Sequence, residues 1–175
     1  MYASRGCIPE MVHLIMRGCN INCGDGEGLT CLHHACEYNR LDVVEALLDV
    51  GKSSLAVNAQ DKYGWTPLHC AAHHGSVQCV QKLLTCNVNL RLKSKAGKTC
   101  LHLACAQNRN AIVPLLLQKD ADLINLGDDM GMTPLHEAAY RGHMALYQEL
   151  CKHPKADIPA KDKLDRQPGD YVANE

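Results

Sequence analysis

Residues 61–75 read DKYGWTPLHCAAHHG and contain the signals that begin and end one short helix. Thr66 is a favoured N-cap residue, and Pro67 suits the first helical position, where its missing N–H costs no hydrogen bond. Gly75 takes the left-handed conformation that ends a helix without steric cost. The Asp and Gly residues of the preceding tip favour a tight turn. The stretch therefore predicts a turn followed by a helix that begins at Thr66 and ends near Gly75.

The T-x-L-H frame at this helix start occurs four times. It is occupied by Thr30-Cys31-Leu32-His33, Thr66-Pro67-Leu68-His69, Thr99-Cys100-Leu101-His102 and Thr133-Pro134-Leu135-His136. The four threonines are 36, 33 and 34 residues apart. A period of about 20 to 50 residues is typical of solenoids, in which each unit buries its apolar face only by stacking on its neighbours. We therefore expect a stack of repeats, with function on its surface.

A second, amphipathic helix is predicted after the first. Residues 76–84 place Val80, Leu83 and Leu84 at spacings of three and four, the stripe of a helix with one buried face. Similar stretches occupy 43–48, 112–117 and 146–151. Where the first helix should end, Gly75 and Gly142 are matched by Asn39 and Asn108, and asparagine is the next most tolerant of the left-handed conformation. Each repeat thus reads turn, helix, turn, helix.

A D-x-x-G tip, T-P-L-H, paired small residues, a Gly-type break and an apolar second helix together resemble the ankyrin repeat. The resemblance implies an all-α fold, an ankyrin-repeat solenoid of stacked helix-turn-helix units with β-hairpin-like loops, over residues 1–175. The expected units are 1–22 (partial), 23–58, 59–91, 92–125, 126–159 and 160–175 (partial). It also implies that the repeated Thr caps its helix and that the repeated His links neighbouring hairpins.

Two departures from the ankyrin pattern affect helix starts. Cys31 and Cys100 replace the proline of the frame, which loosens the start slightly but leaves the threonine cap. Pro114 lies in a second helix, where an interior proline costs about 3 kcal/mol. We therefore expect this helix to begin late, near Ala111 or Ile112, so that Pro114 falls in its first turn.

Both ends of the chain carry incomplete repeats. Residues 162–168 resemble a fifth hairpin, with Asp165 in place of glycine and Gln167 in place of threonine, and the chain ends before a second helix. At the other end, laying Gly6 on Gly75 leaves an N-terminal unit without its first helix. Terminal units without a polar cap expose apolar faces, so we expect the chain to be part of a larger one.

Charge and apolar patterning argue against several partner classes. Eighteen Lys and Arg against 19 Asp and Glu give a net charge of −1, so no overall field recruits nucleic acid. The apolar runs are far shorter than the ~20 residues that span a bilayer, which predicts no membrane insertion. The N-terminus does not read as a signal peptide, and the cysteine count, 11, is odd. These features favour a reducing location, cytoplasmic or nuclear.

The ten histidines and eleven cysteines raise the question of a metal or thiol function. Two groups have spacings that could place two ligands on one helix face: His33, His34 and Cys36, and His69, Cys70, His73, His74 and Cys79. The repeat alignment spreads these side chains over different layers, so we expect no metal and no cofactor. Cysteines 36, 79, 105 and 151 align with small or apolar core positions. Cys7, Cys23 and Cys86 do not, and are the candidate reactive thiols.

Catalytic motifs are also missing from the sequence. There is no G-x-S-x-G, no phosphate-binding G-x-x-x-x-G-K-[ST] loop and no H-E-x-x-H. A Cys–His pair can be drawn anywhere in a chain so rich in both residues, so it has almost no specificity. We therefore expect no enzyme activity.

In ankyrin arrays the hairpin tips and the exposed face of the first helices line a concave groove. The residues at positions there that the repeat leaves variable are the expected protein-binding residues, and aromatic residues, Met and Arg are the types enriched in interface cores and hot spots. The expected residues are Tyr38, Tyr63, Trp65, His73, His74, Lys95, Lys98, Met130, Met132, Tyr140 and Arg141. The hypothesis is a mainly apolar groove for a partner segment, with Lys95, Lys98 and Arg141 giving charge selection. The alternative for Trp65 is packing on a neighbouring hairpin.

Three functions follow as competing expectations. The first is a non-catalytic adaptor or scaffold that binds another protein. The second is a targeting or regulatory ankyrin domain of a larger enzyme or channel, and the third is a zinc- or thiol-based protein. The resemblance also raises Asn22, Asn58 and Asn125 as possible sites of asparagine hydroxylation, against the simpler expectation that they satisfy turn hydrogen bonds.

Overall fold

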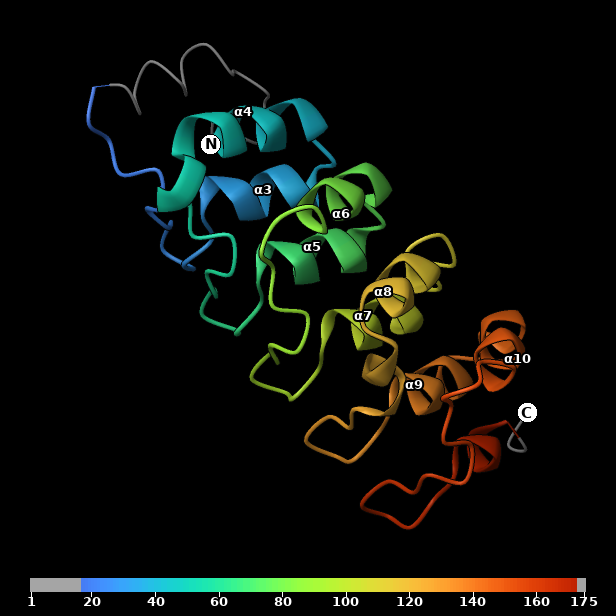
Figure 1. The fold of residues 1–175 in the computed structure, drawn as a ribbon. Helices are drawn as coiled ribbons and strands as arrows, with labels where there is room; N and C mark the ends of the chain where they lie inside the picture. Colours follow the sequence, from blue (N-terminus) through green and yellow to red (C-terminus); the bar gives the residue numbers. More distant parts are fainter. Residues whose placement is uncertain (1–16, 173–175) are drawn as a thin grey trace. The chain divides into compact units, whose positions relative to one another are not determined.

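The computed structural model describes residues 17–172, and the expected N-terminal half-repeat lies mostly outside them (Figure 1). The chain divides into two compact units, residues 1–89 (unit 1) and 90–175 (unit 2). All the regular elements of the described part are helices, and the only β-type pairing there is an isolated bridge between Gly24 and Thr30. None of its helices is long and apolar enough to cross a bilayer. The expected all-α repeat solenoid is confirmed.

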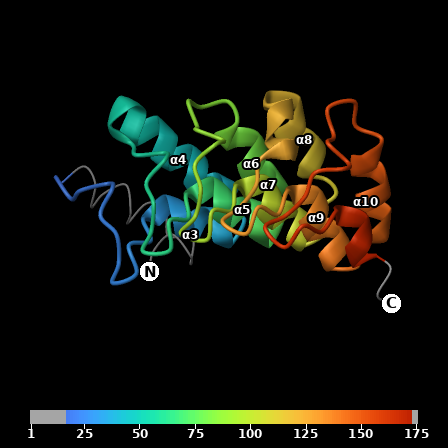
Figure 2. The same cartoon turned by 90° about the horizontal axis from the view of Figure 1, so that it is seen from below.

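The described part of unit 1, residues 17–89, contains two helical pairs. The first is α3 (Cys31–Glu37) with α4 (Leu41–Gly51), which runs into the short 3-10 helix η1 (Lys52–Ser54). The second is α5 (Pro67–His74) with α6 (Val77–Leu83). Helix α3 packs on α5 and α4 on α6, so α3 and α5 form an inner layer and α4 and α6 an outer layer (Figure 2).

Unit 2 repeats this arrangement. Its pairs are α7 (Cys100–Ala106) with α8 (Val113–Lys119), and α9 (Pro134–Tyr140) with α10 (Met144–Cys151). Two 3-10 helices complete the unit: η2 (Ala121–Asn125) after α8, and η3 (Pro168–Tyr171) after the fifth hairpin. The inner helices α7 and α9 pack together, and η3 packs on α9.

The helix boundaries follow the local signals of the sequence. Each frame threonine is the N-cap of its inner helix. The helix ends turn at Asn39, Gly75, Asn108 and Gly142, with φ values of 53°, 83°, 53° and 70°. Pro114 lies in the first turn of α8, whose N-cap is Ile112, so the predicted late start is confirmed. Asp165 has a φ of 66°, which confirms it as the residue that replaces glycine in the fifth hairpin.

The frame histidines are buried hydrogen-bond links. The backbone N–H of Thr99 donates to His102 Nδ1 at 3.1 Å, so this nitrogen accepts and Nε2 carries the proton. His102 Nε2 then donates to the carbonyl of Met132 in the next hairpin at 2.9 Å. His33 makes the same link to Trp65 O, and His136 to Arg166 O. Burial lowers the pKa of all three, of His102 to about 4, which keeps the rings neutral.

The core of each unit is built from small aliphatic residues and thiols, since the chain has no Phe. In unit 1 the stripe predicted for the second helices buries Val80 and Leu83 completely. In unit 2 the equivalent Leu116 is fully buried and Val113 almost so. The thiols of Cys36, Cys79 and Cys105 are completely buried, as expected for core residues, whereas Cys151 is half-buried.

Candidate protein-binding surface

Each hairpin tip is held by a single side-chain oxygen. Asp61 Oδ1 accepts the backbone N–H groups of Tyr63 at 2.8 Å and Trp65 at 2.7 Å. Asp128 Oδ1 binds Met130 and Met132 in the same way, at 2.8 and 3.0 Å. The tip residues therefore have a fixed backbone, and their side chains vary without changing the turn.

Successive tips within a unit are joined by backbone hydrogen bonds. In unit 2 the N–H of Asp129 donates to Ala96 O at 3.2 Å, and that of Lys163 to Met130 O at 2.9 Å. Gly131 has a φ of 74°, and a Cβ there would lie only 3.1 Å from Lys163 N. Both the turn and the close approach of the next hairpin therefore favour glycine at this position.

The expected binding residues of unit 1 form what we call the unit 1 surface, namely Tyr38, Tyr63, Trp65, His73 and His74. Tyr63 at the hairpin tip is 56% exposed, with Lys62 Nζ 4.9 Å from its ring centroid. Trp65 was expected to be exposed but is half-buried, because its ring packs 5.1 Å from that of His73 on α5. His73 in turn meets His74 edge-on at 4.8 Å. The structure thus brings Trp65 and the two histidines into one cluster.

The remaining expected residues form the unit 2 surface, namely Lys95, Lys98, Met130, Met132, Tyr140 and Arg141. Met130 occupies the same tip position as Tyr63 and is 51% exposed, and Tyr140 is also exposed. Met132 is half-buried, and its carbonyl is the acceptor of the His102 link. The unit therefore presents one thioether and one aromatic ring to solvent, beside a group of charges.

Glu137 is a key residue of this group that the sequence analysis did not identify. Its side chain is 1% exposed and accepts from Lys98 Nζ at 2.7 Å and from Arg141 Nε at 3.4 Å. Two of the three cations assigned to charge selection are therefore held by a carboxylate of the protein itself, whereas Lys95 is exposed at a tip. One feature of the sequence could have identified Glu137. It is an acidic residue at a repeat position where α5 has Cys70 and α7 has Leu103, both uncharged.

The C-terminal 3-10 helix adds a second unexpected contact to unit 2. Tyr171 packs edge-on against Tyr140, with ring centroids 5.6 Å apart. Its hydroxyl donates to Asp162 Oδ2 at 2.5 Å, and Arg166 pairs with the same oxygen at 3.0 Å. Burial and this hydrogen bond raise the pKa of Tyr171 to about 12. Burial acts to raise the pKa of Asp162, but its hydrogen bonds from Tyr171, Arg166 and Leu164 outweigh this and lower it.

The three asparagines considered for hydroxylation join successive loops. Asn125 Nδ2 donates to Lys155 O at 2.7 Å, and its Oδ1 accepts from the N–H of Asp157 at 3.0 Å. Asn22 and Asn58 use both side-chain atoms in the same way within unit 1. Their amide groups therefore serve as connectors between repeats.

The thiols and histidines do not gather into a site in the described part of the chain. Between residues 17 and 172 no group of three or more His, Cys, Asp or Glu side chains is placed to hold a metal ion. Cys23 is exposed and Cys86 is half-buried, while Cys7 lies outside the described residues. Cys19 is a further exposed thiol that the repeat alignment did not single out.

Known proteins share this repeat pattern. A family model described as ankyrin repeats (3 copies) matches residues 1–94 and 75–162. The chain is 35% identical over 79% of its length to human transient receptor potential cation channel subfamily A member 1. It is 32% identical over 86% to ankyrin repeat protein nuc-2 of Neurospora crassa, and 33% identical over 76% to the chicken nuclear factor NF-kappa-B p105 subunit.

The matched region is a small part of each relative. The chain spans 13% of the length of the channel subunit and 14% of the other two proteins. What these relatives have in common with it is the matched stretch of ankyrin repeats. The family match over most of the chain and the helical pairs capped by Thr and linked by His agree, and the chain belongs to the ankyrin repeat family.

Proposed function

We propose that the chain is a non-catalytic protein-binding module that uses its hairpin tips and inner helices. Ankyrin repeats generally mediate protein–protein interaction, and the unit 1 and unit 2 surfaces are the proposed contact residues here. The observation that carries the proposal is the exposure of Tyr63 and Met130, 56% and 51%, at the same position of rigid tips. Because the tip backbone is already fixed, binding through these side chains costs little backbone conformational entropy, which favours them as anchors.

The proposed location is cytoplasmic or nuclear. Its support is the use of reduced thiols as packing groups, since Cys36, Cys79 and Cys105 fill the core. Burial raises the pKa of Cys70 and of Cys100 to about 12, which keeps these groups as neutral thiols.

Affinity capture with matched surface variants tests the proposal. Wild-type chain, Tyr63→Ser, Met130→Ser and Ile158→Ser are used to capture proteins from one extract, followed by quantitative mass spectrometry. Ile158 is the control, because it is an exposed apolar residue, 43% accessible, on the loop between α10 and the fifth hairpin, and it belongs to neither proposed surface. We expect a set of proteins to be lost with the two tip variants and kept with Ile158→Ser. Equal capture by all four chains contradicts the assignment.

The second candidate is a targeting or regulatory domain of a larger enzyme or channel. The observation in its favour is the 35% identity to a segment that makes up 13% of a cation channel subunit. Sequencing of the full transcript tests it. A reading frame that continues into membrane-spanning or catalytic sequence supports this candidate, and a frame with repeats alone favours the adaptor.

A further inference from the structure

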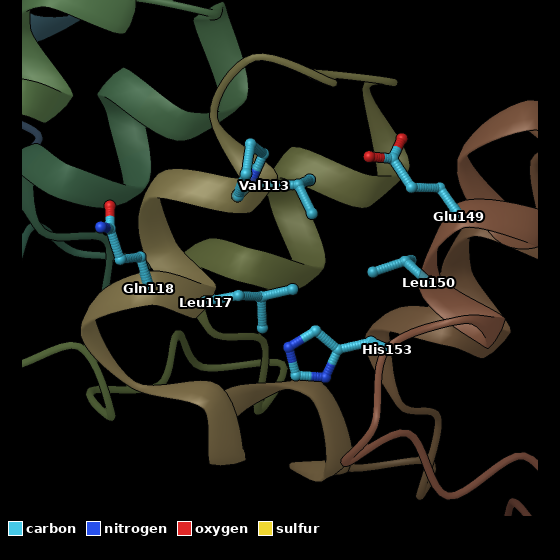
Figure 3. A pocket seen from close by; sticks show the side chains of 7 residues that line it. Val113, Leu117, Gln118, Glu149, Leu150 and His153 are labelled. Atoms are coloured by element: carbon cyan, nitrogen blue, oxygen red, sulfur yellow. The ribbon is translucent and has the colours of Figure 1, made fainter.

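An open pocket of about 250 Å³ lies between the outer helices α8 and α10 of unit 2 (Figure 3). Its apolar lining consists of Val113, Pro114 and Leu117 from α8 and Leu150 from α10. Figure 3 shows Leu117 and Leu150 pointing toward one another across the gap, with Glu149 at one end and His153 at the other. The pocket belongs to the outer layer, so it is separate from the tips and inner helices of the proposed function.

The internal repeat shows how this seam differs from its counterpart in unit 1. There α4 and α6 pack directly on one another and are bridged by an ion pair, Lys82 Nζ to Glu45 Oε1 at 3.2 Å, and the open pocket of that seam lies beyond this pair, where Leu48 and Cys86 line it. In the repeat alignment Glu45 corresponds to Pro114, and Lys82 corresponds to Glu149. The corresponding ion pair cannot form in unit 2, because Pro114 on α8 has no charge. Glu149 on α10 is a carboxylate at the position where unit 1 has the Lys82 ammonium group.

Glu149 is an exposed carboxylate at the rim of the pocket. No ion pair or side-chain hydrogen bond of Glu149 is present within residues 17–172, and its side chain is exposed. His153, the other ionisable group of the lining, accepts the N–H of Lys155 at Nδ1, 3.3 Å away. Among the lining residues Glu149 is thus the one side chain with a fixed charge, next to an apolar floor.

We propose that this pocket binds a partner protein segment in which an aliphatic side chain stands beside a Lys or Arg. An apolar cavity of about 150 Å³ holds a benzene molecule, whereas pockets for drug-sized ligands are about 300 Å³ or more. At about 250 Å³ the pocket fits one large side chain better than a small-molecule ligand. The Lys or Arg of the segment pairs with the Glu149 carboxylate. It supplies the basic partner that α8 lacks, because Pro114 occupies the position where unit 1 has the charged residue of its ion pair.

Two blocked dipeptides probe the pocket in the full chain. Acetyl-Leu-Arg-amide and acetyl-Leu-Glu-amide are titrated into ¹⁵N-labelled protein at low salt, and amide shifts are followed by NMR. We expect shifts that concentrate on α8 and α10, and an affinity for the basic peptide about two- to fivefold higher, the range of an exposed ion pair. Acetyl-Gly-Arg-amide should bind more weakly than acetyl-Leu-Arg-amide, because it lacks the apolar anchor.

Charge reversal at Glu149 makes the decisive comparison. Glu149→Lys should reverse the preference, so that the acidic dipeptide binds more tightly. Asp157→Lys is the matched control, because it changes the charge by the same amount at an exposed position on the loop after α10 and should keep the preference for the basic peptide. The proposal is overturned if no peptide shifts α8 and α10, if both charged peptides bind equally, or if Glu149→Lys leaves the preference unchanged.

Discussion

The inner faces of the two units use the same backbone but fill it in different ways. In unit 2 Lys98, the residue before a frame threonine, pairs with Glu137 on the following inner helix. The equivalent positions of unit 1 hold Leu29 and Cys70, an apolar residue and a neutral thiol. This difference shows that the T-x-L-H frame sets the backbone geometry of each repeat. The residues at its variable positions determine whether the inner face is apolar or ionic. Under the proposed function, a partner of unit 1 would meet mainly rings and aliphatic groups, whereas a partner of unit 2 would meet Lys98 and Arg141 already paired with Glu137.

The largest effect expected for unit 2 is a loss of stability at acidic pH, caused by the buried His102 ring that links two hairpins. Burial lowers its pKa to about 4, from 6.5, so the unfolded chain binds more protons between these two values. Its contribution to stability is therefore complete above about pH 6.5 and is lost as the pH falls toward 4. The shift corresponds to about 3 kcal/mol.

Urea unfolding at neutral and at acidic pH checks this expectation. Repeat proteins do not always unfold in one step, so a global signal would mix the two units. The unfolding of unit 2 is therefore followed by the NMR amide signals of α7 and α9. Wild type should lose about 3 kcal/mol more than His102→Gln on acidification, although the variant is less stable at neutral pH because it lacks the ring's links. Equal losses in the two proteins would show that His102 does not control the acid response.

Breaking the ionic group of unit 2 is the next largest change. Lys98→Met leaves Glu137, which is 1% exposed, with Arg141 alone. Removing one partner of a fully buried pair costs about 3–5 kcal/mol, and because Lys98 is half-buried we expect about 2 kcal/mol. The double variant Lys98→Met/Glu137→Met should recover most of this loss, because it leaves no buried charge and places uncharged side chains at both positions, as in unit 1.

Amide hydrogen exchange of α9 measures its unfolding free energy in both variants. Lys95→Met is the control, since Lys95 is exposed at a tip and should change the unfolding free energy by less than about 0.5 kcal/mol. A double variant that is less stable than Lys98→Met would mean that Glu137 stabilises the fold by contacts other than this pair.

Local sequence signals predicted the helix boundaries well. They did not predict which side chains from different repeats or elements come into contact. Thr133 caps its helix, Pro114 sits in a first turn and Asp165 turns the fifth hairpin because each depends on residues within one turn of itself. Glu137 meets Lys98 across 39 positions of sequence, a contact decided by side-chain directions in two repeats. The packing of Trp65 on His73 likewise depends on a rotamer that its sequence neighbours do not determine.

Tyr171→Phe gives a smaller and more local effect. It removes the hydrogen bond to Asp162 Oδ2 and keeps the ring against Tyr140. We expect a loss of about 1 kcal/mol above the unfolded pKa of aspartate, about 3.9, and this loss shrinks only as the pH falls through the lower, folded pKa of Asp162. The sign follows because the folded pKa of Asp162 is depressed, so its stabilisation is present above that pH and disappears on protonation.

A carboxyl NMR titration checks the cause of the Tyr171 effect directly. The pKa of Asp162 should rise in Tyr171→Phe, since one of the hydrogen bonds to its charged form is gone. It should remain below the value of an exposed aspartate, because the N–H groups of Leu164 and Arg166 still donate to it at 2.8 and 3.0 Å. An unchanged pKa would show that these backbone bonds and the Arg166 guanidinium hold the carboxylate without the Tyr171 hydroxyl.

The tips should give the smallest stability changes and so test whether the two units are equally available for binding. Tyr63→Ala removes a ring that contacts Lys62 Nζ at 4.9 Å, an exposed cation–π contact worth about 0.5 kcal/mol, while Met130→Ala removes no such contact. We therefore expect the unfolding free energy to fall by about 0.5 kcal/mol in the first variant and by less in the second, measured by urea unfolding. A loss above about 1 kcal/mol for Tyr63→Ala would place its ring in the structural framework of unit 1. Near-neutral values at both tips would mean that the free protein gains little from these side chains, so their apolar surface stays available for a partner.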